Sequence, residues 1–141
     1  MSPKGRAVIA GGAGFVGSHL CHRLIAEGYH VTCLDNYVTG KLENLADLID
    51  SGRLDVRLTD VADPFDVAGD VDLILHFASP ASPADYLQLP LETMRAGSVG
   101  TFNMLELARE KQARFIFAST SESYGDRGRR VWVLTRSPGV R

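Results

Sequence analysis

The chain has 141 residues, 45% of them hydrophobic, and a formal net charge of −2. This length is enough for one domain with its own hydrophobic core and too short for two. The small negative charge excludes the broad basic field that attracts nucleic acid, so we expect no nucleic-acid partner.

Apolar runs and amphipathic segments alternate along the chain. Residues 7–10 predict a buried strand that ends in glycines, and residues 14–27 predict a helix that Gly28 closes as a C-terminal cap. The further expected elements are strands at 29–34, 54–58, 71–77 and 114–119, a short helix at 42–51, and a long helix at 91–111 with Gly97 and Gly100 in its middle.

Strands that alternate with helices predict right-handed βαβ crossovers and a parallel sheet covered on both faces. We therefore expect the α/β class, with a Rossmann-like doubly wound sheet of five strands in the order 3-2-1-4-5. Ligands of such sheets bind at the carboxyl ends of the strands, at the switch point between strands 1 and 4.

The segment Gly11-Gly-Ala-Gly-Phe-Val-Gly17 predicts a phosphate-binding loop. It follows an expected strand and opens an expected helix, which is the context that gives a glycine pattern its meaning. The first glycine permits a tight turn, the middle one lets the backbone approach a pyrophosphate, and the last lets the helix pack on the strand. The alternative is a glycine turn without a ligand.

Asp35 ends the second expected strand, 18 residues after Gly17. A carboxylate at this place accepts hydrogen bonds from a ribose diol and repels a 2′-phosphate, which favours NAD over NADP. Lys41 nearby weakens that preference slightly. The alternative for Asp35 is a residue that starts a loop and contacts no ligand.

Two cysteines, Cys21 and Cys33, match neither a disulfide scaffold nor a zinc spacing, so we expect buried, reduced thiols and no metal site. No run reaches the roughly 18 apolar residues of a membrane span, and residues 7–10 are too short for a signal peptide. We therefore expect a cytoplasmic protein with no membrane partner.

Five segments carry a resemblance to a known family. They are residues 11–20 (GGAGFVGSHL), Asp35-Asn36-Tyr37 with Gly40 and Asn44, Asp60-Val61, residues 76–80 (HFASP) and residues 118–125 (ASTSESYG). With them, residues 6–125 resemble the extended short-chain dehydrogenase/reductases, which are sugar-nucleotide epimerases, dehydratases and decarboxylases. Residues 78–83, 97–101 and 118–122 most resemble the bacterial UDP-glucuronate decarboxylases, which make UDP-xylose.

This resemblance implies an NAD cofactor and a set of site residues. The implied cofactor-binding residues are Gly11, Gly14, Phe15, Val16 and Gly17 at the pyrophosphate, Asp35 and Asn36 at the adenosine ribose, Asp60 and Val61 at the adenine, and Ala78 and Ser79 toward the nicotinamide. The implied catalytic residues are Thr120, whose hydroxyl would hydrogen-bond the sugar oxygen that is oxidised, and Glu122, a carboxylate near the sugar. His76 is expected to be a satisfied strand-end histidine.

The resemblance also implies a reaction and partners. UDP-glucuronate would be oxidised at C4, lose carbon dioxide from the resulting 4-keto intermediate and be reduced to UDP-xylose. A sister 4,6-dehydratase or 4-epimerase is the alternative, although Ser121 stands where dehydratases usually carry an acidic proton donor. Relatives of full length usually form homodimers through the long helix, here residues 91–111, and through the catalytic helix that we expect this chain to lack.

The end of the chain is expected to depart from the family. Relatives carry a catalytic Tyr-x-x-x-Lys beyond the Thr120 segment, a motif that we expect this chain to lack, since its last lysine is Lys111 and its last tyrosine is Tyr124. Residues 126–141 hold five arginines and one aspartate, a charge of +4. We expect an NAD-binding domain over residues 1–125, without the C-terminal part of the family fold, and an aberrant, disordered basic tail over residues 126–141. A reading-frame break would explain the tail, and a functional basic tail is the alternative. For the function of the chain, the alternative is a non-catalytic nucleotide-binding fragment.

Overall fold

The computed structural model describes residues 4–120 and 123. Its five strands are β1 (Gly5–Ala10), β2 (Tyr29–Asp35), β3 (Leu54–Leu58), β4 (Leu73–His76) and β5 (Arg114–Phe117). Its helical segments are α1 (Phe15–Ala26), the 3₁₀ turn η1 (Leu42–Leu45), α2 (Ala46–Ile49), α3 (Pro83–Gln88), α4 (Pro90–Arg95), the π-helical turn η2 (Ala96–Gly100) and α5 (Thr101–Lys111).

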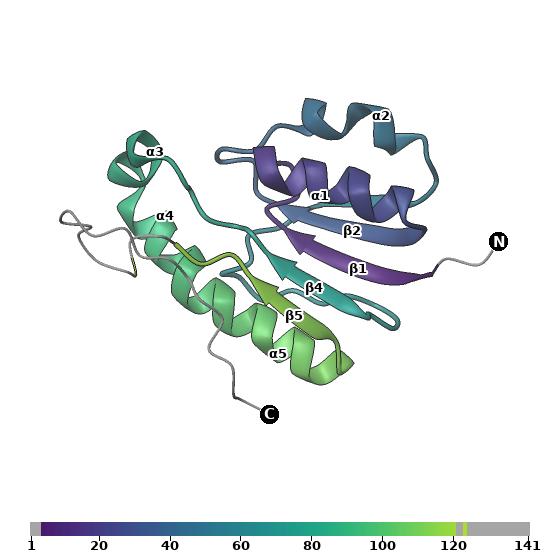
Figure 1. Cartoon of the computed structure of the whole chain (residues 1–141). Helices are drawn as coiled ribbons and strands as arrows, with labels where there is room; N and C mark the ends of the chain where they lie inside the picture. Colours follow the sequence, from purple (N-terminus) through teal and green to yellow (C-terminus); the bar gives the residue numbers. More distant parts are fainter. Residues whose placement is uncertain (1–3, 121–122, 124–141) are drawn as a thin grey trace, which may run out of the picture.

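The strands form one parallel sheet in the order β3-β2-β1-β4-β5, which confirms the predicted topology. Helices α1 and α2 lie over one face of the sheet and α5 covers the other (Figure 1). The central strand β1 pairs with β2 on one side and β4 on the other, so that Ile9 lies opposite both Cys33 and Leu75. The chain therefore reverses its winding direction between β1 and β4, where the expected ligand crevice lies.

Two buried clusters, one on each face, hold these layers together. Successive residues of β1 alternate between them: Ala7 and Ile9 pack under α1 and α2, whereas Val8 and Ala10 pack under α5. All four are fully buried. Apolar residues on both sides of one strand confirm that the sheet is covered on both faces.

The observed helices differ from the expected ones in three places. The short helix expected at 42–51 consists of the 3₁₀ turn η1 followed by α2. The long helix at 91–111 is divided into α4, η2 and α5, because a π-helical turn replaces the regular hydrogen bonding at 96–100, around Gly97 and Gly100. The proline-containing stretch before it, where the sequence predicted no helix, contains α3. None of the helices in residues 4–120 is long and apolar enough to cross a membrane.

Candidate functional site

The phosphate loop begins with a tight turn against the end of β4. Gly11 has a φ of +79°, and a Cβ added to it would lie 2.6 Å from the Phe77 carbonyl carbon and 2.8 Å from the Ala78 nitrogen. Its own N–H donates to the Leu34 carbonyl of β2 at 2.8 Å. Only glycine combines this conformation with such a close approach. The loop therefore sits over the switch point, in contact with the chain that leaves β4.

The last glycine of the loop brings α1 directly onto the turn. A Cβ on Gly17 would overlap the Gly11 carbonyl oxygen and lie 2.8 Å from the Cα of Gly12. Gly14, in contrast, has one neighbour near its missing Cβ, the Gly11 oxygen at 3.3 Å. Its position is therefore open on the side from which a ligand would approach.

Helix α1 begins at Phe15 with no side chain on its first N–H groups. Gly14 occupies the N-cap position and makes no side-chain cap, and the first turn holds no acidic residue. Phe15 is 80% exposed, so the helix end is reachable from solvent. Unpaired N–H groups and the positive end of the helix dipole favour an anion at this place. The residues present thus fit the pyrophosphate of a dinucleotide.

Asp35 is a buried carboxylate that ties the phosphate loop to the next loop. It is 7% exposed, and its Oδ2 accepts the Ala13 N–H at 2.9 Å while its Oδ1 accepts the Tyr37 N–H at 2.8 Å. A Cβ on Gly40 would lie 2.9 Å from Oδ1. Each carboxylate oxygen keeps a second acceptor site, so a ribose hydroxyl could still be bound. Asn36 next to it is exposed, and its Oδ1 accepts the Val38 N–H at 3.2 Å.

Ala13 is a connecting residue that the sequence analysis missed. Its carbonyl oxygen accepts two hydrogen bonds, from the Lys41 N–H at 3.0 Å and from the Asn44 Nδ2 at 2.8 Å. Its N–H is the one that Asp35 accepts. Backbone groups carry no signature in a sequence, and the position of Asn44 was the only available signal.

The expected adenine residues lie at the end of β3. Asp60 accepts the Ala62 N–H through Oδ1 at 2.9 Å. Val61 is 3% exposed, and its carbonyl accepts Asn103 Nδ2 at 2.8 Å. A Cβ on Gly100 would lie 2.8 Å from the Val61 side chain. Val61 therefore packs into the core beneath the π-helical turn rather than standing open to solvent.

The residues expected to face the nicotinamide and the sugar follow β4 and β5. Ala78 is half-buried and Ser79 is exposed. The Ala118 N–H donates to the His76 carbonyl at 3.1 Å, which continues the β4–β5 pairing one residue beyond the end of β5. Thr120, two residues further along the chain, is exposed. Glu122 and the segment 126–141 lie outside the described residues.

His76 anchors the π-helical turn from beneath. Its Nε2 lies 3.0 Å from Thr101 Oγ1 and 3.3 Å from the Ala96 carbonyl. The Thr101 hydroxyl donates to Gly97 O, so Nε2 must carry the proton and Nδ1 is an acceptor. Among the described residues, Nδ1 is buried without a partner, so His76 is satisfied at one nitrogen only. Burial lowers the pKa of His76, and the Ala96 carbonyl partly opposes this effect.

One Tyr-x-x-x-Lys spacing does occur, from Tyr37 to Lys41, so the expectation that the chain lacks this spacing is wrong as a statement about the whole sequence. It does not lie on a helix: Tyr37 has a φ of +58°, and Lys41 is extended. Burial, with Cys33 and Asp35 nearby, raises the pKa of Tyr37, whereas a tyrosine base needs a lowered pKa. This pair is therefore a poor candidate for the catalytic motif.

The two cysteines lie beneath the phosphate loop, on α1 and β2. Both are buried and free, as predicted. A Cβ on Gly12 would lie 2.5 Å from the Cys33 Sγ. A hydrogen bond with Cys21, together with burial, raises the pKa of the Cys33 thiol, so the thiol stays protonated. Both act as packing residues under the loop.

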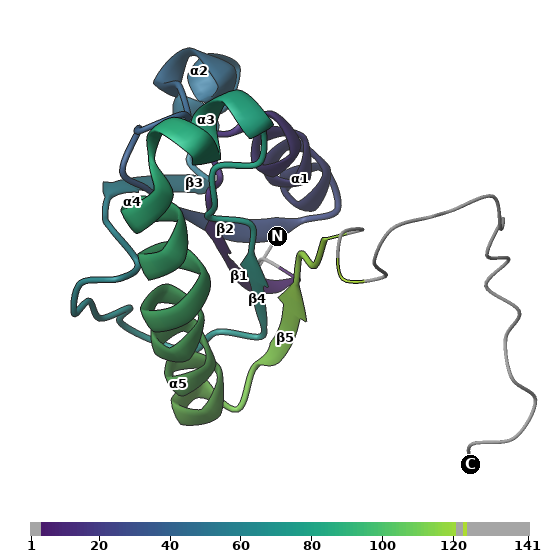
Figure 2. The same cartoon turned by 90° about the vertical axis from the view of Figure 1, so that its left-hand side faces the viewer.

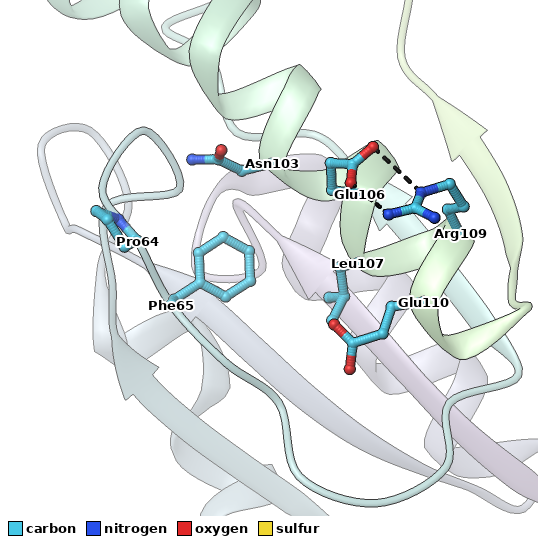
Figure 3. Close-up of a pocket in the computed structure, with 7 residues that line it drawn as sticks. All are labelled: Pro64, Phe65, Asn103, Glu106, Leu107, Arg109 and Glu110. Carbon is cyan, nitrogen blue, oxygen red and sulfur yellow. Dashed lines mark hydrogen bonds and ion pairs between the residues drawn. The ribbon is translucent and has the colours of Figure 1, made fainter.

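A separate cleft of about 350 Å³ lies between the segment after β3 and α5 (Figure 3). Phe65 and Leu107 form its apolar part, and Glu106 and Arg109, which are neighbours on α5, form an ion pair of 2.8 Å on one wall. Its lining includes none of the expected cofactor-binding residues. One lining residue, Asn103, is linked to the expected adenine site, because its side chain donates to the Val61 carbonyl.

The sequence profile of the NAD dependent epimerase/dehydratase family matches residues 7–137. The chain belongs to this family. The matched stretch extends past residue 125, so the point at which the chain departs from the family pattern stays a prediction.

Curated members of the family are similar to the chain over most of its length. UDP-glucuronic acid decarboxylase 1 of Danio rerio is 46% identical over 121 residues, which are 86% of this chain and 28% of that protein. UDP-glucuronic acid decarboxylase 1 of Arabidopsis thaliana is 47% identical over 121 residues, 86% of this chain and 27% of that protein. The chain thus spans little more than a quarter of the length of these relatives.

Solved structures of the family share the fold. UDP-N-acetylglucosamine 4-epimerase from Methanobrevibacter ruminantium M1 superimposes with a TM-score of 0.81 at 26% identity, over 94% of this chain and 43% of that one. UDP-glucose 4-epimerase from Thermus thermophilus, solved as a complex with NAD, gives a TM-score of 0.65 at 30% identity, over 82% of this chain and 37% of that one. Both confirm the Rossmann-like fold, and the second is a family member with NAD bound.

Proposed function

We propose that the chain is the NAD-binding portion of a UDP-glucuronate decarboxylase. The observation that carries this proposal is the contact of Gly17 with Gly11, which places the open end of α1 over the switch point of the sheet, with Asp35 beside it. The identity of 46% to a UDP-glucuronic acid decarboxylase supports the choice of reaction. The resemblance to the bacterial enzymes in particular stays a prediction.

The chain's own residues would divide the cofactor between them. Backbone N–H groups at Phe15 and Val16 would bind the pyrophosphate, and the carboxylate of Asp35 would accept from the ribose hydroxyls. Asn36 would assist at the ribose. Asp35 also disfavours a 2′-phosphate by charge repulsion, which is why we propose NAD rather than NADP.

The adenine and nicotinamide ends rest on residues from the other strands. Asp60 and Val61 would flank the adenine, the latter through its backbone because its side chain is buried. Ala78 and Ser79 would line the path to the nicotinamide. NAD, when bound, supplies a reversible hydride acceptor for the sugar carbon.

Thr120 and Glu122 are the proposed catalytic residues. The Thr120 hydroxyl would donate a hydrogen bond to the sugar oxygen, where negative charge develops after loss of carbon dioxide. Glu122 would move protons near the sugar. The same residues would serve a 4,6-dehydratase or a 4-epimerase, and the epimerases among the similar structures keep that alternative open.

Calorimetry with NAD and NADP tests the cofactor part of this proposal, and carbon dioxide release from UDP-glucuronate tests the reaction. We expect NAD to bind more tightly than NADP. We expect no turnover from these 141 residues alone, because no Tyr-x-x-x-Lys follows Thr120 and loss of a general base costs on the order of 10²–10⁴ in rate. Equal affinity for the two cofactors would remove Asp35 from its proposed role, and carbon dioxide release above background would show that another base serves.

A second copy of the chain is the proposed macromolecular partner. Four large apolar side chains along α4 and α5 are exposed, namely Leu91, Met94, Phe102 and Leu105. These helices run end to end along one side of the molecule, next to β5, the last strand of the sheet within the described residues (Figure 2). Exposed apolar patches of this kind favour association. Light scattering checks this part: a monodisperse monomer would contradict it.

A further inference from the structure

Asn44 lies outside the expected set of cofactor residues, yet its side chain reaches the centre of the phosphate loop. Its Nδ2 donates to the Ala13 carbonyl at 2.8 Å across 31 positions of the sequence. Since a carbonyl oxygen can only accept, the amide must present its NH₂ group, which fixes the orientation of the Asn44 side chain. The contact is therefore a specific hydrogen bond.

The segment that carries Asn44 is well anchored. It lies in η1, where the next residue, Leu45, is fully buried against the cluster under α1. The Asn44 N–H donates to the Lys41 carbonyl at 3.1 Å, and the Lys41 N–H is the second donor to Ala13 O. The backbone that carries the Asn44 side chain is therefore held in place by burial and hydrogen bonding.

The peptide groups of Ala13 connect the proposed ribose site at Asp35 with the proposed pyrophosphate site at the N-terminus of α1. On the nitrogen side, the Ala13 N–H donates to Asp35 Oδ2 at 2.9 Å, and Asp35 is the proposed ribose ligand. On the carbonyl side, the Ala13–Gly14 peptide leads directly into the N-terminus of α1. The Gly14 N–H has only a long hydrogen bond of 3.2 Å, to Gly11 O.

A glycine at position 14 gives this peptide little resistance to rotation, because glycine accepts both signs of φ. Rotation of the Ala13–Gly14 peptide would exchange an N–H group and a carbonyl oxygen within a loop that must face an anion. The hydrogen bonds from Lys41 and Asn44 to the Ala13 carbonyl oxygen oppose this rotation, because both would have to break. One of the two donors is a backbone group, which any residue supplies, and the other requires the Asn44 side chain.

We propose that Asn44 is a positioning residue for dinucleotide binding: by holding the Ala13 carbonyl, it fixes the phosphate loop in the arrangement that the pyrophosphate of NAD requires. This inference rests on the proposed NAD site. A loop that is ordered before binding does not have to be ordered by the ligand, which raises affinity without a new ligand contact.

The test is the substitution Asn44→Leu, which keeps the size of the side chain and removes the donor. Loss of one hydrogen bond of this kind predicts NAD affinity about three- to tenfold weaker. ADP should lose affinity by the same factor, and adenosine by much less, because adenosine has no pyrophosphate. A merely structural role would lower thermal stability and leave the ratio of ADP to adenosine affinity unchanged. Glu43→Gln, at an exposed neighbour in the same turn, is the matched control and should bind NAD as the wild type does.

Two further measurements complete the experiment. Asn44→Gln retains an amide donor and should recover part of the affinity lost in Asn44→Leu, and Asn44→Ala, which also lacks the donor, takes the place of the leucine variant if that variant fails to fold. Asn44→Leu combined with Asp35→Asn should cost less than the sum of the single changes, because both act through Ala13. Wild-type NAD binding together with equal affinity in Asn44→Leu would overturn this inference alone. A wild type that binds no NAD would overturn the proposed function and this inference with it.

Discussion

Replacing Gly17 by alanine tests the contact on which the phosphate loop depends. The new Cβ would overlap the Gly11 carbonyl oxygen and lie 2.8 Å from the carbonyl carbon of Gly11 and the Cα of Gly12, whereas ordinary contacts begin at 3.4 Å. All three neighbours are backbone atoms, so no side chain can rotate away. The N-terminus of α1 would have to move by several tenths of an ångström or more.

Two opposing contributions set the size of the effect. Overpacking costs about 1–3 kcal/mol, and rigid backbone neighbours put Gly17 at the upper end. Alanine in a helix in place of glycine returns about 1 kcal/mol. We therefore expect the free energy of unfolding to fall by about 2 kcal/mol. For a domain of about 120 residues, an unfolding entropy of about 0.25 kcal/mol/K makes this a fall of about 8 °C in melting temperature.

Gly97→Ala is the matched control for this experiment. Gly97 also lies in a helical segment, and a Cβ there would meet nothing within 4 Å. Only the gain in helix propensity remains, so the melting temperature should rise by up to about 4 °C. Thermal unfolding followed by circular dichroism measures both variants. If Gly17→Ala melted within a degree or two of the wild type, the close approach of α1 to the loop would be refuted.

The remaining predictions concern the ligand and pH. Gly14→Ala, whose Cβ has a single neighbour at 3.3 Å, should melt close to the wild type and bind NAD at least about tenfold more weakly, because its methyl group stands where the backbone approaches the pyrophosphate; unchanged NAD affinity in calorimetry would contradict this. Asp35→Ala should narrow the preference for NAD over NADP, and a preference left intact would assign discrimination to another residue. Burial lowers the pKa of His76 in the folded chain, whereas in the unfolded chain the imidazole keeps its ordinary pKa of 6.5. As the pH falls below 6.5, the unfolded chain therefore takes up a proton before the folded chain does. The contribution of neutral His76 to the free energy of unfolding is complete above pH 6.5 and is lost as the pH falls through the lowered pKa. The difference in melting temperature between the wild type and His76→Gln should therefore shrink from pH 8 to pH 5, and a constant difference would show that His76 does not titrate in this range.

The strand order and the phosphate loop could be predicted from the sequence because their signals are local. Each strand is a short apolar run, and the three glycines of the phosphate loop, Gly11, Gly14 and Gly17, lie close together in the sequence. The positive φ of Gly28, just after α1, agrees with the C-terminal cap expected from glycine at this position. Local patterns of this kind depend on backbone sterics, which a sequence shows directly.

The sequence contains a local signal for the start of helix α3, which was missed because prolines usually count as evidence against a helix. Ser82 is its N-cap and accepts the Asp85 N–H at 3.2 Å, with Pro83 at the first helical position. A serine, a proline and an acidic residue in this spacing indicate a helix start. The π-helical turn was different: Gly97 and Gly100 indicated an interruption, but its form depends on His76, 20 or more positions earlier in the chain.

The role of Ala13 could not have been predicted, because it consists entirely of backbone groups. An alanine in this place says nothing about which donors reach its carbonyl. The position of Asp35 indicated a ribose ligand, but not that each of its oxygens already accepts a backbone N–H. Contacts between segments 22 to 31 positions apart are set by packing, and packing becomes visible only when the loops are placed on the sheet.

The two halves of the proposed site differ in how they are held, and this difference separates two measurable properties. Residues 7–44 supply the phosphate loop, Asp35 and Asn44, and the contacts among them are short and internal to this stretch. The sugar side takes Ser79 and Thr120 from the ends of two different strands, and both are exposed. A site held by its own short loops is ordered before it binds, whereas exposed strand-end residues depend on what packs against them. Substitutions at the phosphate loop, at Asp35 and at Asn44 should therefore change cofactor affinity, and Thr120→Ala should leave NAD affinity as it is in the wild type. A large loss of NAD affinity in Thr120→Ala would show that the two halves form one coupled site.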